Sequence, residues 1–103
     1  MQTEHRRALR HLLGGAVEVI GLETGKQIVT VARNFSLLGC FVATVTPFVT
    51  GRKVRLRITH GGATFAALGR VAYASVSEGM GIAFGEIEAR DRAILDTWLG
   101  EQP

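Results

Sequence analysis

The chain has 103 residues, of which 47% are hydrophobic and 20% charged, with a mean hydropathy of +0.21. This length suits one domain, expected over residues 1–103, and the composition excludes a disordered chain. The formal charge of +3 would attract a phosphorylated ligand but lacks the basic excess of a histone-like protein.

Cysteine content and hydropathy indicate where the protein functions. Cys40 is the only cysteine, which rules out an intramolecular disulfide and a cysteine-based zinc site and fits the reducing cytoplasm. The longest apolar stretch, Leu12 to Leu22, contains Glu18 and three glycines, so it is too short and too polar to span a membrane. It also lacks a signal-peptide cleavage site. We therefore expect a cytoplasmic protein without a membrane segment.

In chain order, residues 1–11 are polar and basic and predict a flexible N-terminal arm. Residues 12–86 then alternate between β-branched or apolar runs and turn residues such as glycine, asparagine and proline. The high count of 13 glycines against two prolines also favours strands and turns over helices. The predicted strands are Ala16–Leu22, Gln27–Ala32, Cys40–Thr46, Lys53–Thr59, Thr64–Ser75 and Met80–Phe84. Six short strands with regular turns predict a mainly β fold, a closed or nearly closed antiparallel barrel.

Two segments show clear periodicity. From Lys53 to Ile58 cations and aliphatic residues alternate, as expected for a strand with one face in solvent. At the C-terminus, Ile94, Leu95, Trp98 and Leu99 form an apolar stripe that predicts a helix over residues 87–100. The acidic residues near its start, Glu86, Glu88 and Asp91, are expected to be solvated charges that suit the helix dipole.

The arm carries an R-x-x-x-R motif formed by Arg6 and Arg10, with Arg7 between them. A guanidinium group is planar and permanently charged, so it can bind a phosphate through two hydrogen bonds or pair with the O6 and N7 edge of guanine. Two such groups four residues apart on an extended arm can reach one nucleotide. Arginine pairs at this spacing are also common in solvent-exposed arms, so the motif alone is weak evidence.

A second motif, N-x-S-x-x-G, is formed by Asn34, Ser36 and Gly39. Asn34 and Ser36 alternate past Phe35 and would project from one face of an extended segment. Gly39 would permit a positive φ or a close approach to the backbone by a ligand. The same residues are ordinary turn formers, since asparagine and serine cap turns by bonding nearby backbone groups.

The combination of motifs is more specific than either one. Together with Gly79-Met80-Gly81-Ile82-Ala83-Phe84, a G-x-G-hydrophobic-x-F element, the chain resembles a PilZ domain over nearly its whole length. The resemblance implies a non-enzymatic cytoplasmic receptor for the bacterial second messenger cyclic di-GMP. It implies that Arg6 and Arg10 grip phosphates and guanine edges, that Asn34 and Ser36 hydrogen-bond the ligand, and that Gly39 leaves room for it. Binding would order the arm onto the barrel and signal to a partner protein.

Two positions leave parts of this interpretation open. Asn34 stands where aspartate is common in the family, and its neutral amide would bond guanine less strongly. His5 precedes the first motif arginine, at a position that influences whether one or two ligands bind, and it does not settle that number. His5 and Arg7 are further candidate ligand contacts.

Other functions are weaker candidates. A PilZ-like adaptor that binds only proteins is one alternative, and a small nucleic-acid-binding barrel, suggested by the basic stripe Arg52–Arg57, is another. Arg70 could contact the ligand at its rim, although a surface role is the simpler interpretation. No metal site or cofactor is predicted, because His5, His11 and His60 are irregularly spaced. No enzyme is predicted either, since Cys40 has no histidine partner placed by the sequence and the acidic residues form no catalytic pair.

Overall fold

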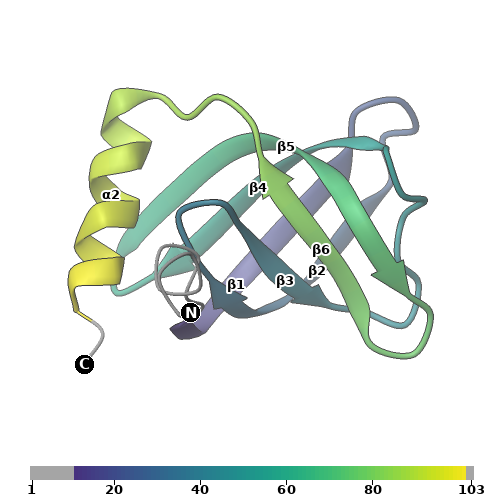
Figure 1. Ribbon diagram of the computed structural model, residues 1–103, viewed down its shortest axis with the longest axis horizontal. Coiled ribbons are helices and arrows are strands. Elements are labelled where there is room, and N and C mark those ends of the chain that lie inside the picture. Colours follow the sequence, from purple (N-terminus) through teal and green to yellow (C-terminus); the bar gives the residue numbers. More distant parts are fainter. Residues whose placement is uncertain (1–10, 102–103) are drawn as a thin grey trace, which may run out of the picture.

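The protein folds as an antiparallel β-barrel with one helix beside it, in a computed structural model that describes residues 11–101 (Figure 1). The strands of the barrel are β1 (His11–Gly21), β2 (Gln27–Phe35), β3 (Gly39–Ala43), β4 (Lys53–His60), β5 (Ala63–Ser75) and β6 (Gly79–Phe84), and the helix is α2 (Ala89–Gly100). The strands close in the order β1-β2-β3-β6-β5-β4, each antiparallel to its neighbours. The six-stranded barrel and C-terminal helix predicted from the sequence are therefore confirmed.

Several strand ends differ from the prediction. β1 begins at His11 rather than Ala16, and β2 continues to Phe35 rather than ending at Ala32. The two extensions pair with each other, since His11 lies opposite Phe35. An irregularity in the register between Leu12 and Gly15 accommodates this extension. Pairing between distant segments thus determines where these strands end, and local composition does not reveal it.

The barrel interior follows the alternation seen in the sequence. In β4, Val54, Leu56 and Ile58 are buried while Lys53, Arg55 and Arg57 are exposed, as predicted. The inward-facing side chains of the other strands complete one apolar core, whose largest fully buried members are Phe35, Phe65, Leu56, Ile58, Met80 and Leu95. Cys40 belongs to this core, with no exposed surface.

Helix α2 covers one mouth of the barrel (Figure 1). Its Trp98, only 3% exposed, lies against Phe35 and Phe65, with ring centroids 6.1 Å apart in both pairs. The ring of His60, at the end of β4, meets Trp98 edge-on at 5.5 Å. The apolar stripe predicted for the helix therefore has a specific role, which is to bring an aromatic side chain over the mouth of the barrel.

The opposite mouth is covered by the loop between β3 and β4. Phe48 is partly buried against the core, and its backbone N–H points to the Sδ atom of Met80 at 3.4 Å. The end of the loop is fixed by backbone hydrogen bonds: Gly51 N donates to Val71 O at 2.8 Å and Val71 N donates to Arg52 O at 2.9 Å. These bonds tie the loop to β5 and hold it in one position.

Asp91 fastens the helix to the barrel, which corrects the expectation that it is a solvated charge. β6 pairs with β5 only from Gly69 to Ser75, so the first half of β5 lacks a strand partner on that side. Gly85 N donates to Leu68 O at 2.8 Å, and Ala66 N donates to Asp91 Oδ1 at 2.9 Å. Asp91 is only 8% exposed because it satisfies this strand edge.

Replacing Asp91 is expected to destabilise the fold. Asp91→Ala leaves the Ala66 N–H without an acceptor and should lower the free energy of unfolding by about 1–3 kcal/mol. Asp91→Asn keeps an acceptor oxygen and should lower the free energy of unfolding by a smaller amount. Asp96→Ala is the control, because this exposed aspartate of the same helix has, within residues 11–101, a single ion pair, with Arg92. Urea denaturation gives the free energy of unfolding of all three variants. Equal decreases for Asp91→Ala and Asp96→Ala would contradict the role of Asp91 as acceptor for Ala66.

Candidate functional site

The second sequence motif lies where β2 turns into β3, beside the start of β1. Asn34 is half-buried in β2 and pairs with Leu12 of β1 and Phe41 of β3. The pairing of β2 with β3 shifts register between Ala32 and Asn34. Asn34 thus sits between two neighbouring strands near the point where the described chain begins.

Ser36 shapes the turn that follows. Its Oγ atom accepts a hydrogen bond from Leu38 N at 3.1 Å, and its own N–H donates to Gly39 O at 2.8 Å. The side chain is 2% exposed. This arrangement is the turn-forming role of serine recognised in the sequence. The hydroxyl still has a proton that it can donate to a ligand.

Gly39 is required by the barrel itself. Its backbone does not adopt a positive φ, so of the two sequence-based alternatives for this glycine the close backbone approach applies. A methyl group at this position would overlap the carbonyl oxygen of Ile82 on β6, a backbone atom that cannot move aside without breaking the strand pair. The close approach that calls for glycine here is therefore made by β6.

The third motif forms β6 and pairs with the second. Gly39 lies opposite Ala83, and Phe84 N donates to Leu38 O at 2.9 Å. On the outer face, Phe41 and Tyr73 stack across Gly81 with ring centroids 6.1 Å apart. The N-x-S-x-x-G and G-x-G-x-x-F elements therefore lie on adjacent strands and share backbone hydrogen bonds.

The arginine motif lies outside the described residues, together with His5 and Arg7. What the structure does describe is the start of β1, where His11 and Leu12 pair with Phe35 and Asn34. Arg10 directly precedes His11 in the sequence. The chain therefore enters the barrel beside the second motif.

The comparisons with known proteins agree with this architecture. The sequence matches the PilZ domain family over residues 4–101. The chain belongs to the PilZ domain family. A similar solved structure is that of the "PilZ domain of CeSA from cellulose synthesizing bacterium", with a TM-score of 0.68, 17% sequence identity and coverage of 88% of this chain and 95% of that one. At this identity the likeness shows the shared fold. No curated protein sequence matches the chain.

Membership of the PilZ domain family indicates the general class of function. PilZ domains generally bind cyclic di-GMP and are typically non-catalytic receptor domains. Within residues 11–101, no cluster of His, Cys, Asp and Glu side chains is arranged to hold a metal ion. In the same range, no helix is long and apolar enough to cross a membrane.

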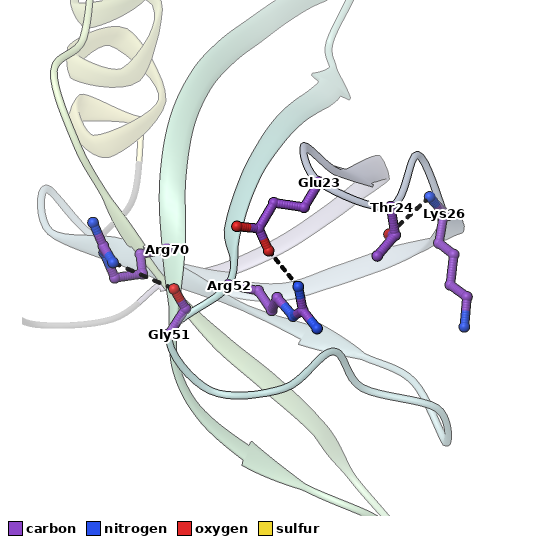
Figure 2. Close-up of polar contacts among 6 residues, drawn as sticks. All are labelled: Glu23, Thr24, Lys26, Gly51, Arg52 and Arg70. Carbon is purple, nitrogen blue, oxygen red and sulfur yellow. Dashed lines mark hydrogen bonds and ion pairs between the residues drawn. The ribbon is translucent and has the colours of Figure 1, made fainter.

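A hollow of about 410 Å³ lies at the barrel mouth opposite the helix. It is bounded by the turn between β1 and β2 and by the loop between β3 and β4 (Figure 2). The sequence predicts both connecting segments only as turns. Their juxtaposition could not be found from local patterns, because the lining residues of the two segments are 18 to 32 positions apart and meet only when the barrel closes. The one signal was the basic stripe that starts at Arg52.

The role of Gly39 in the barrel gives a prediction about stability. Gly39→Ala should lower the free energy of unfolding by about 3 kcal/mol, the upper end of the usual range for overpacking, because the obstacle is backbone. Gly81→Ala is the matched control on the neighbouring strand. Its methyl group would meet the ring of Tyr73, which is 48% exposed and can turn outward. Thermal and urea unfolding of both variants test this, and a Gly39→Ala variant no less stable than Gly81→Ala would contradict it.

Proposed function

We propose that this PilZ domain is a receptor for cyclic di-GMP, bound between the arginine motif and the turn that joins β2 to β3. The observation that carries the proposal is the register of β1 and β2. Because Leu12 pairs with Asn34, the chain that carries Arg6 and Arg10 enters the barrel beside Asn34 and Ser36. The family's general ligand supports the same conclusion.

The covalent chain keeps both arginines close to the second motif. Arg10 is the immediate neighbour of His11, and five peptide links separate Arg6 from it, at most about 18 Å when fully extended. An arginine side chain adds several ångströms to this reach. Both guanidinium groups can therefore reach a ligand that contacts Asn34. The chain does not have to be fully extended for this.

The chemistry of each group suits one part of the ligand. The two phosphates of cyclic di-GMP are anions, which arginine binds through paired, charge-assisted hydrogen bonds. The amide oxygen of Asn34 can accept from the N1 or N2 atoms of a guanine, and the hydroxyl of Ser36 can donate. His5 and Arg7 are additional contacts within reach of the same ligand.

Binding then changes the surface of the domain. A ligand held by residues from both the arm and the barrel draws residues 1–10 onto the barrel, and a partner protein recognises the surface that results. The free energy of the ligand contacts offsets the loss of chain entropy in this step. The protein needs no catalytic residue for this role, since its output is a change of shape.

Removal of either motif arginine should weaken binding. A hydrogen bond to a charged group contributes about 1.5–3 kcal/mol, so Arg6→Ala or Arg10→Ala should each lower the affinity for cyclic di-GMP by about 10- to 100-fold in calorimetric titration. Arg55→Ala is the control, an exposed arginine on the outer face of β4. Full-strength binding by an Arg6→Ala/Arg10→Ala double variant would refute this site. No heat and no thermal shift with the native chain would instead favour the adaptor that binds only proteins.

The neutral side chain at position 34 leads to a gain-of-affinity prediction. Asn34→Asp supplies a charged acceptor to guanine, and the difference between a charged and a neutral hydrogen bond, about 1 kcal/mol, corresponds to about fivefold tighter binding. Asn34→Ala removes the acceptor and should weaken binding. The same titration measures both, with urea denaturation as the control for stability. If both variants bind cyclic di-GMP with unchanged affinity, Asn34 is not a ligand contact.

A further inference from the structure

The hollow at the mouth opposite the helix has the features of a second, independent binding site. We call it the mouth cleft, and its lining includes Lys26, Phe48, Arg52 and Lys53. Gln27, at the cleft, and Asn34, in the ligand motif, lie seven residues apart on β2, about 23 Å along an extended strand. The mouth cleft is therefore too distant to share a small ligand with the motif residues.

Charge in the mouth cleft is predominantly positive. Of the part of the chain that the structure describes, three cations, Lys26, Arg52 and Lys53, and one carboxylate, that of Glu23, line it. Glu23 forms an ion pair with Arg52, and Figure 2 shows the two side chains pointing toward each other. Among the described residues, Lys26 and Lys53 have no ion pair. The cleft thus has two uncompensated cations at its rim and a third held by an exchangeable partner.

The ion pair is easily exchanged because it lies in solvent. The side chains of Arg52 and Glu23 are 42% and 64% exposed, and a pair of this kind contributes at most about 1 kcal/mol. An incoming carboxylate can take the place of Glu23 on Arg52 at little cost. Arg52 itself stays in position, because its backbone is bonded to Val71 and Val49.

The rest of the lining combines an apolar surface with the polar residues Thr24, Gln27 and Thr46. Pro47, Phe48 and Val49 contribute the loop side, and Ile28 contributes the strand side. The tip of the loop is left exposed, with Val45 at 73% and Val49 at 67%. Since backbone bonds to β5 hold the loop end, this apolar surface requires little ordering when a partner binds.

We propose that the mouth cleft binds an acidic peptide segment of a partner protein, with carboxylates on Lys26, Arg52 and Lys53 and an apolar side chain against Pro47, Phe48 and Val49. Charge complementarity selects a polyanion. The lining selects a peptide over a nucleic acid, because Phe48 alone among the described lining residues is aromatic and it is partly buried in the core. Single-strand binders need aromatic side chains on which bases stack. The basic face of β4, with Arg55 and Arg57, steers such a partner toward the cleft.

The probe is the peptide Glu-Glu-Leu-Glu-Glu-Phe-Glu-Glu, with a twin in which every glutamate is glutamine. Titrated into the full chain labelled with ¹⁵N, the acidic peptide should shift the amide signals of residues 21–28, 46 and 48–53 in a saturable manner, and the glutamine twin should not. No saturable shift with the acidic peptide, or equal shifts with both, would overturn the proposal. Tighter binding of oligothymidylate at the same amides would also overturn it, in favour of nucleic acid.

Variants separate a local site from general charge attraction. Lys26→Glu/Lys53→Glu should weaken peptide binding by about tenfold or more. Arg90→Glu/Arg92→Glu changes the net charge equally at exposed residues of α2, which covers the opposite mouth of the barrel, and should change affinity by less than about threefold. Equal losses in the two doubles would overturn the proposal. Glu23→Gln removes the competing carboxylate and should strengthen binding by about threefold, and weaker binding would count against it.

The proposal does not depend on cyclic di-GMP binding. Arg6→Ala/Arg10→Ala should leave peptide affinity unchanged, so failure of one proposal leaves the other intact. Amide spectra of each variant report whether it is folded. If Lys26→Glu/Lys53→Glu does not fold, Glu23→Gln still tests the cleft, because it removes only an exposed ion pair.

Discussion

The barrel closes through a strand pair of unequal length, since β5 has 13 residues and β6 has six. The half of β5 that β6 does not reach would present unpaired backbone groups, which are costly when shielded from water and prone to pair with other chains when exposed. The segment that follows β6 covers this edge through Gly85 and Asp91. The position of α2, and with it the placement of Trp98 over the core, follows from this requirement.

The two motifs that lie in the described residues, N-x-S-x-x-G and G-x-G-x-x-F, also help to build the barrel. Ser36 closes the turn between β2 and β3, Gly39 lets β6 approach, and Leu38 bonds Phe84 at the end of β6. A residue in such a motif therefore has two roles, one in forming the barrel and one that we propose in binding. Loss of binding on mutation of Gly39 would not by itself identify a ligand contact, because the same substitution disturbs the pairing of β3 with β6.

The sequence predicted the strands well where one face is buried and the other exposed. Lys53 to Ile58 is the clearest case, because its alternation reports the burial directly. It failed where an interaction joins segments distant in the chain. Nothing near Asp91 indicates that it accepts from Ala66, 25 residues earlier, and the extension of β1 to His11 depends on the end of β2. For the proposed ligand site, motif spacing gave Asn34, Ser36 and Gly39 as candidates, but the mouth cleft forms from two loops that carry no motif.

The bond between Asp91 and Ala66 also makes one amide proton informative about dynamics. The N–H of Ala66 is protected from solvent by a side chain of the helix and by no strand. Its hydrogen exchange therefore reports the local opening in which α2 leaves the barrel, while amides within the ladder between β4 and β5 report more global unfolding. Comparing the two exchange rates would give the free energy that holds the helix in place, separately from that of the barrel.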